Sequence, residues 1–407
     1  MPRANKRILV YSHDSFGLGH LRRCQTIANC LAAAMNDVSV LILTGSSIVG
    51  SFEFHPRVDY MRLPGILKRS SGDYVSSHLD MSIEETAALR AAMIRTVADS
   101  FDPDLFLVDK EPLGLRGEVE GTLDLLRHRG VPVILGLRDV MDDQELLAAE
   151  WKRKSAVAAL DAYYNEIWVY GPRRFYDPLA GLELPEAVRH KMVFTGYLRR
   201  MAPHSQRISA PRLPFGEHGY ILVTAGGGGD GAELFDWVLR AYEHVNDIPY
   251  PAYIVFGPFL ESEHQRAYYE RAARLERVAA TDFEAGLEQL MKGAVGVVAM
   301  GGYNTFCEIL SLDKRTLIVP RTKPRLEQFI RAARAQELGL AQMLVDDGRR
   351  EPKVMAEALR RLPSQARPST SMMPGLLDGI ENLTRRAQRR LARGRKATVV
   401  TLAAHRA

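Results

Sequence analysis

The feature that most constrains the fold is an alternation of short apolar segments with longer amphipathic ones. In the first half of the 407 residues, apolar segments lie at 7–12, 38–45, 58–65, 103–109, 131–139, 166–171 and 191–200. Near-continuous apolar strands that alternate with helices are typical of a parallel sheet covered on both faces. One helix has a marked start, because Ser82 followed by Glu85 is the pattern of a capping box.

The same alternation restarts in the second half, after a segment rich in proline, serine and glycine that lacks periodicity. We interpret 201–215 as a linker between an N-terminal domain (1–200) and a C-terminal domain (216–363), followed by a basic C-terminal extension (364–407). The predicted fold class is α/β, with two Rossmann-like, doubly wound parallel-sheet domains that face a cleft. Open sheets of this kind bind ligands at the carboxyl ends of their strands, so the cleft is the expected site.

Composition excludes several classes of protein. Hydrophobic residues make up 46% and charged residues 25% of the chain, the balance of a soluble globular protein. The three cysteines (Cys24, Cys30 and Cys307) form no CxxC pair, so we expect no structural zinc, no disulfide framework and a reducing compartment. We see neither a signal peptide nor a bilayer-spanning segment, and expect a cytoplasmic protein.

Much of the net charge of +5 comes from the segment 383–396, LTRRAQRRLARGRK. Because the excess is local, we expect no nucleic acid partner for the body of the protein. Two interpretations of the tail stay open: an ordinary solvated terminal helix, or a peripheral contact with an anionic membrane.

The first glycine-rich loop lies between the first strand and the first helix, in YSHDSFGLGHLRR at 11–23. Gly17 and Gly19 allow a tight turn close to a ligand, and His20 stands at the start of the helix. A neutral imidazole there would accept a proton from a hydroxyl group or from water. We weigh this role evenly against a histidine that only caps or packs.

A second glycine run, Gly226 to Gly229, follows an apolar strand and precedes a helix. Consecutive backbone N–H groups together with a helix N-terminus suit a diphosphate. No G-K-[ST] follows, so this is not a Walker A loop. A flexible turn is the alternative, and we favour the phosphate interpretation.

The most informative stretch is 297–340. A strand ends in Gly301 and Gly302, and the helix that follows carries Asn304, Thr305 and, one turn further, Glu308. A carboxylate at that place would accept hydrogen bonds from both hydroxyls of a ribose. After the next strand, Glu327 and Gln328 begin another helix.

This stretch resembles the nucleotide-sugar-binding region of the GT-B glycosyltransferases, especially the family of the peptidoglycan N-acetylglucosaminyltransferase, which has a family 28 C-terminal domain. The matching positions are Gly301, Gly302, Thr305, Glu308, Pro320, Glu327, Gln328, Arg331 and Ala332. The resemblance implies that Glu308 holds the ribose, that Gly226, Gly227, Gly228, Gly229 and Thr305 lie near the diphosphate, and that Gln328 contacts the donor sugar. It also implies that the acceptor enters from the N-terminal domain and that no metal ion or cofactor takes part.

The segment GLGHLRR is similar to a motif of the related UDP-sugar hydrolase of pseudaminic acid synthesis, G-x-G-H-x-x-R. His20 and Arg23 match it, and the resemblance implies that His20 is the catalytic base.

The segments LVDKEPLGLRGE and LGLRDVMDD place Asp109, Lys110, Arg138 and Asp139 at strand ends beside the cleft. We include Asp139 with His20 as a catalytic candidate.

The sequence thus predicts a metal-independent glycosyltransferase that moves a sugar from a nucleotide-diphosphate sugar, UDP-linked by resemblance, to a glycan or lipid-linked hydroxyl acceptor. Two alternatives stay open. One is a UDP-sugar hydrolase or 2-epimerase on the same scaffold, because fold does not fix the reaction. The other is a non-catalytic protein that binds nucleotide sugars.

Overall fold

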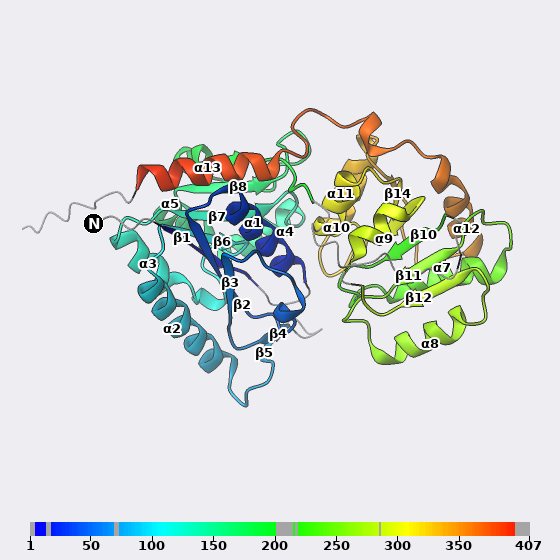
Figure 1. Ribbon diagram of the computed structural model, residues 1–407, viewed down its shortest axis with the longest axis horizontal. Helices are drawn as coiled ribbons and strands as arrows, with labels where there is room; N and C mark the ends of the chain where they lie inside the picture. Colours follow the sequence, from blue (N-terminus) through cyan, green and yellow to red (C-terminus); the bar gives the residue numbers. More distant parts are fainter. Residues whose placement is uncertain are drawn as a thin grey trace, which may run out of the picture.

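The computed structural model describes residues 5–13, 18–68, 73–200, 215, 219–284 and 286–394. They form two α/β domains side by side, with the carboxyl ends of both sheets directed toward the space between them (Figure 1). The expected linker at 201–215 lies, apart from Phe215, outside the described residues.

The N-terminal domain contains a seven-stranded parallel sheet in the order β3-β2-β1-β6-β7-β8-β9. Its strands are β1 (Lys6–Tyr11), β2 (Val38–Thr44), β3 (Val58–Arg62), β6 (Leu105–Asp109), β7 (Val133–Arg138), β8 (Glu166–Tyr170) and β9 (Met192–Phe194). The helices are α1 (Gly19–Ala34), α2 (Ile83–Phe101), α3 (Glu120–His128), α4 (Gln144–Arg153), α5 (Ala156–Tyr163) and α6 (Glu186–Lys191). Each apolar segment of the first half forms a strand, as expected. The capping box at the start of α2 is also confirmed.

The C-terminal domain contains a six-stranded parallel sheet in the order β12-β11-β10-β13-β14-β15. Its strands are β10 (Ile221–Thr224), β11 (Ala252–Val255), β12 (Val278–Thr281), β13 (Gly296–Ala299), β14 (Thr316–Ile318) and β15 (Gln342–Met343). The helices are α7 (Ala232–His244), α8 (Ser262–Ala272), α9 (Leu287–Gly293), α10 (Tyr303–Ser311), α11 (Glu327–Glu337) and α12 (Pro352–Arg361). Strands β12 and β15 were not expected from the sequence. Neither was an antiparallel hairpin of β4 (Ile66–Lys68) and β5 (Tyr74–Ser76) in the N-terminal domain.

The C-terminal extension is not separate from the body. Helix α13 (Gly379–Arg393) returns from the C-terminal domain and lies along the N-terminal domain (Figure 1). Leu383, Ala387 and Leu391 are buried there in one core with residues of α1. Arg390 forms a 2.7 Å ion pair with Glu166 of β8. Part of the basic segment therefore belongs to the structure of the N-terminal domain, while 395–407 lie outside the described residues.

One hydrophobic core spans both domains. Phe306 of α10 packs against Phe175 and Tyr197 of the N-terminal domain, with ring centroids 5.8 and 5.3 Å away. Beside these rings, Arg331 of α11 forms a bidentate ion pair with Asp139, which follows β7, and both side chains are fully buried. Apolar burial and a buried charge pair together fix how the two sheets face each other.

We expect Asp139→Asn to lower the free energy of unfolding by about 3–5 kcal/mol, because it leaves the Arg331 charge buried without its counter-ion. Urea unfolding followed by circular dichroism measures the loss. Glu357→Gln is the matched control, since it removes an exposed pair with Arg361 and such pairs contribute about 0–1 kcal/mol. Equal effects of the two substitutions would contradict the role given to the buried pair.

Candidate functional site

A cavity of about 1520 Å³ lies between the two domains. Strand-to-helix loops of both sheets line it, as expected for the carboxyl ends of parallel strands. The sites expected from the sequence that line it are Gly19, His20, Arg23, Gly226, Gly227, Gly228, Gly229, Gly302, Asn304, Thr305, Glu327 and Gln328. Three expected residues, Gly301, Glu308 and Asp139, are not part of the lining, and Gly17 lies outside the described residues.

The glycine loop forms one wall of this cavity at the N-terminus of α7. Gly226 and Gly228 have φ values of +70° and +90°, which favour glycine. A Cβ on Gly228 would lie 2.3 Å from the carbonyl oxygen of Phe256, so no other residue fits there. The loop thus presents backbone groups and a helix N-terminus to the cavity, an arrangement that suits a phosphate group.

The start of α10 forms the neighbouring wall. Gly302 is the N-cap residue, and a Cβ built on it meets no atom within 4 Å. Thr305 faces the glycine loop, with Oγ1 3.7 Å from the place of a Cβ on Gly226. Two helix N-termini therefore point into the same space, and their partial positive charges add.

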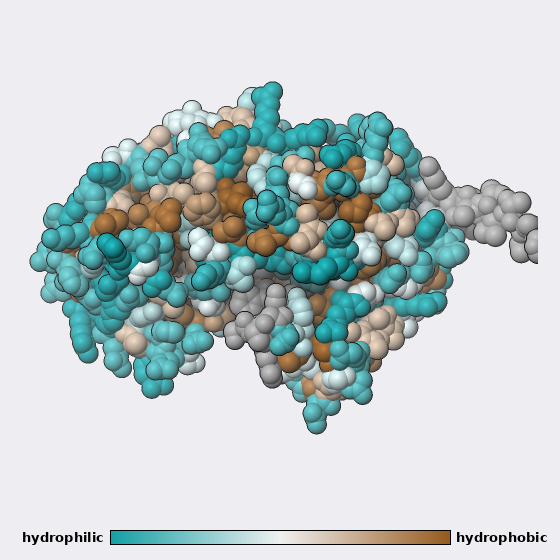
Figure 2. Space-filling view, turned by 180° about the vertical axis from the view of Figure 1, so that it is seen from behind, coloured by the Kyte–Doolittle hydropathy of each residue, from teal (hydrophilic) through white to brown (hydrophobic). Residues whose placement is uncertain are grey.

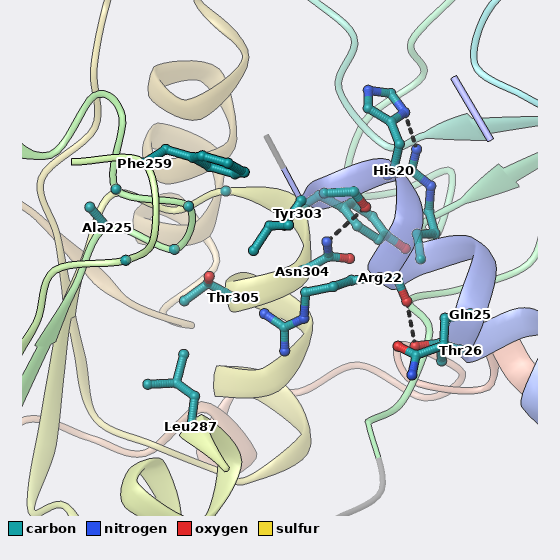
Figure 3. A pocket seen from close by; sticks show the side chains of 18 of the residues that line it. His20, Arg22, Gln25, Thr26, Ala225, Phe259, Leu287, Tyr303, Asn304 and Thr305 are labelled. Carbon is teal, nitrogen blue, oxygen red and sulfur yellow. Dashed lines mark hydrogen bonds between the residues drawn. The ribbon is translucent and has the colours of Figure 1, made fainter. Parts of the chain in front are cut away.

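Asn304 connects α10 to the opposite domain rather than remaining free for a ligand. Its Nδ2 donates a 2.9 Å hydrogen bond to the carbonyl oxygen of Gly19, drawn as a dashed line in Figure 3. Its Oδ1 accepts a hydrogen bond from Arg200. The amide thereby holds the start of α1 against the start of α10.

His20 and Asp109 form a pair on the N-terminal side of the cavity. His20 Nδ1 lies 2.5 Å from Asp109 Oδ2, at the end of β6. We assign the proton of this contact to Nδ1, which leaves the lone pair on Nε2. Arg23 Nη2 also lies 3.0 Å from Nδ1. Arg23 donates from Nε to the other oxygen, Asp109 Oδ1, at 2.9 Å. The carboxylate therefore orients the imidazole while Arg23 orients the carboxylate.

Electrostatics keep this pair in its basic form. Burial lowers the pKa of His20 to about 4, although Asp109 opposes the shift. Burial alone would raise the pKa of Asp109, but Arg23 and His20 hold it well below its usual range. At neutral pH the site therefore contains a neutral imidazole supported by a carboxylate, which is the arrangement of a general base.

Cationic side chains gather around the glycine loop and the start of α11. Arg321 lies 3.0 Å from Asp230 and 3.2 Å from Glu327. Glu327 also pairs with Arg138 at 2.5 Å, across the domain boundary. Gln328 Oε1 accepts a 3.2 Å hydrogen bond from the backbone N–H of Arg321. Glu327 and Gln328 thus position Arg321 at the cavity wall.

The interpretation of Asp139 as a catalytic residue needs correction. Its side chain is fully buried, with Arg331 on both oxygens and the Tyr197 hydroxyl donating to Oδ2 at 2.6 Å. No oxygen of Asp139 is left for a substrate. Gly301 also lies behind the wall of the cavity. A Cβ at this position would lie 2.7 Å from Ile318, and the carbonyl oxygen of Gly301 accepts a hydrogen bond from Arg331. Asp139 joins the two domains, whereas Gly301 holds Arg331 in place within the C-terminal domain.

Some residues of the site were not predicted from the sequence. Phe259 and Phe283 line the cavity and are 39% and 40% exposed, a suitable surface for a flat ring. Arg22 reaches across the cleft into the C-terminal domain. Nothing in the spacing of residues 20–23 indicates which arginine points inward, since that depends on how the two domains meet.

Among the described residues, no group of three or more His, Cys, Asp or Glu side chains is arranged to hold a metal ion. No helix in the described ranges is both long and apolar enough to cross a membrane.

We expect Gly302→Ala to fold normally but to bind a nucleoside diphosphate roughly tenfold more weakly, because its Cβ enters the space between the two helix N-termini. Calorimetric titration with UDP measures the affinity. Gly121→Ala is the matched control, on α3 with its nearest atom 4.0 Å from the new Cβ. Unchanged affinity in Gly302→Ala would place the diphosphate elsewhere.

Comparisons with known proteins agree with this geometry. Residues 220–383 match the family model described as the glycosyltransferase family 28 C-terminal domain. No curated protein matches the chain.

Solved structures resemble nearly the whole chain. The calicheamicin glycosyltransferase CalG4 is 16% identical, with 96% of this chain and 99% of that chain covered and a TM-score of 0.60. MurG of Acinetobacter baumannii is 13% identical, with 94% and 99% covered and a TM-score of 0.58. A UDP-N-acetylglucosamine 2-epimerase is 14% identical, with 94% of each chain covered and a TM-score of 0.58. At these identities the likeness concerns the fold, and the expected two-domain GT-B arrangement is confirmed.

Proposed function

We propose that this chain is a GT-B glycosyltransferase that transfers a sugar from a UDP-linked donor to a hydroxyl group of an acceptor. The match of residues 220–383 to the family 28 C-terminal domain and the likeness to GT-B folds support the proposal. The observation that carries the proposal is the His20–Asp109 pair, which shares one cavity with the glycine loop and the start of α10. A base on one side and a phosphate-binding wall on the other are the two parts that such a transfer needs.

In this proposal the C-terminal domain holds the donor. The diphosphate lies between Gly226–Gly229 and the start of α10, where backbone N–H groups and two helix N-termini stabilise negative charge. Arg321 lies beside the loop, where it pairs with Asp230 and Glu327, and in this proposal its guanidinium also donates to the diphosphate. These groups act most strongly as the diphosphate leaves, because its charge increases at that moment.

The N-terminal domain supplies the base. His20 Nε2 takes the proton of the acceptor hydroxyl while the acceptor oxygen forms a bond to the anomeric carbon. The bond from that carbon to the diphosphate oxygen breaks, and the leaving diphosphate keeps the electron pair. Asp109, hydrogen-bonded to Nδ1, stabilises the imidazolium that forms. Since Asp139 is committed to Arg331, it plays no part in this step.

We expect His20→Gln to lower the turnover of the transfer about 10²- to 10⁴-fold and to leave the dissociation constant of the UDP-sugar within about twofold, since His20 does not touch the proposed donor site. The acidic limb of the wild-type pH profile should lie nearer pH 4 than 6.5, because burial lowers the pKa of His20 to about 4 and the base form is lost only below that pH. His190→Gln, at an exposed position, should change neither quantity. Equal turnover of His20→Gln and wild type would remove His20 from the reaction.

A UDP-sugar hydrolase or 2-epimerase is the second candidate, because the same base could act on water or on the sugar. The likeness to the 2-epimerase fold leaves this candidate open. Incubation with UDP-sugars and no acceptor separates the two: rapid release of free sugar favours the hydrolase, and an epimerised donor without free sugar favours the epimerase. Slow release that an acceptor accelerates favours the transferase.

We also propose that the protein works in the cytoplasm against an anionic membrane surface, where a lipid-linked acceptor would be presented. Arg385, Arg389 and Arg393 of α13 are exposed, and clustered arginines add about 1 kcal/mol each near anionic lipid. The face seen in Figure 2 is mostly hydrophilic, with hydrophobic residues in groups that hydrophilic ones separate. The exposed arginines of α13 support attraction by charge as the basis of this contact.

We expect the triple substitution of Arg385, Arg389 and Arg393 by glutamine to weaken binding to phosphatidylglycerol vesicles more than tenfold at low salt. Sedimentation with vesicles measures the bound fraction. The control substitutes three exposed arginines of the C-terminal domain, Arg266, Arg349 and Arg361. If both triple variants bind equally, α13 is not the contact.

A further inference from the structure

Arg22 occupies an unusual place for a residue of the N-terminal domain. It begins on α1, crosses the cleft and ends beside Thr305 and Leu287 of the C-terminal domain (Figure 3). Its Nη2 lies 2.7 Å from Glu308 Oε1 and 2.8 Å from Glu288 Oε1. The guanidinium is therefore held between two carboxylates of the domain in which the donor would bind.

This contact satisfies only one of the two carboxylate oxygens of Glu308. Its side chain is fully buried, yet Oε2 has no hydrogen-bond partner among the described residues. Burial raises the pKa of Glu308 to about 7, against the lowering influence of Arg22. A buried carboxylate oxygen without a partner costs free energy, so this carboxylate has the capacity to accept a further donor.

The spacing along α10 indicates which donor that would be. Thr305 faces the glycine loop, where the proposed diphosphate lies, and Glu308 follows three residues later. Three residues of an α-helix rise about 4.5 Å, roughly the step from a diphosphate to the ribose attached to it. Glu308 is thus at ribose distance. It is absent from the cavity lining, whereas Arg22, which contacts it, is part of that lining.

We propose that Arg22 occupies the ribose position of the donor site, and that a nucleotide must displace its guanidinium from Glu308 in order to bind. The ribose hydroxyls then donate to both oxygens of the carboxylate, including the unpaired Oε2. Because Arg22 belongs to one domain and Glu308 to the other, each donor that enters breaks an ion pair between the domains. This inference rests on the proposed nucleotide-sugar function.

The alternative is a simple ion pair that only joins the domains. It predicts that removing Arg22 affects stability and leaves nucleotide binding unchanged. Arg325 offers a matched comparison, since it also crosses the boundary, with contacts of 3.2 Å to Asp142 and 2.9 Å to Glu150. Arg325 also lines the cavity, but its partners are Asp142 and Glu150, so its substitution leaves the contact between Arg22 and Glu308 in place.

The experiment is a calorimetric titration of the full chain with UDP, GDP and ADP, for wild type, Arg22→Gln, Arg325→Gln, Glu308→Gln and the Arg22→Gln/Glu308→Gln double variant. We expect Arg22→Gln to bind one nucleoside diphosphate at least tenfold more tightly than wild type, since the competing charged hydrogen bonds are gone. Arg325→Gln should bind as wild type does. The gain should disappear in the Glu308→Gln background, because the ribose then lacks its carboxylate.

Each other outcome has a definite meaning. If Arg22→Gln binds the nucleotide as weakly as wild type or more weakly, the inference is overturned while the donor site stands. The inference is also overturned if Arg325→Gln gains as much affinity as Arg22→Gln, since that would indicate general loosening of the domains. Binding by Arg22→Gln alone, with none by wild type, supports the inference most strongly. If no nucleotide binds to any variant, the donor site of the proposed function and the inference fail together. Circular dichroism confirms that each variant is folded.

Discussion

The buried contact between the two domains is the constraint on which the site depends. Arg331 and Asp139 pair where no water reaches them, beside a core of aromatic rings from both domains. Separating the domains would expose that core and leave two charges without partners, both at a high cost. The carboxyl ends of the sheets are consequently held face to face, and the cavity between them has a defined shape before any ligand enters.

Within that frame, each domain contributes a different kind of chemistry. The C-terminal domain contributes backbone N–H groups and helix N-termini, which suit a diphosphate and require glycine where a side chain would collide. The N-terminal domain contributes the His20–Asp109 pair, in which a carboxylate fixes the tautomer of a neutral imidazole. Neither part is complete without the other, so the domain contact determines the proposed reaction as well as stability.

The same contact brings polar side chains of the two domains together at the site. Asn304 bonds to the start of α1, and Arg22 covers the buried carboxylate of Glu308. These polar groups would otherwise lack partners in a partly buried cleft, where an unpaired group is costly. In the structure these groups pair with side chains of the protein itself, so a ligand that binds here would compete with those side chains.

The sequence by itself determined the elements, the two parallel sheets and the loops that face the cleft, because strand periodicity, glycine runs and helix starts act over a few residues. It also indicated His20 and the glycine loop, which lie at strand-to-helix junctions in either domain taken alone. It could not decide between a reacting and an anchoring carboxylate. Asp109 ends one strand and Asp139 follows the next strand of the same sheet. Asp109 pairs with His20 inside its own domain, whereas only the position of the second domain brings Arg331 to Asp139. Contacts between residues nearly two hundred positions apart depend on how the two domains pack, and no local pattern in the sequence records that packing.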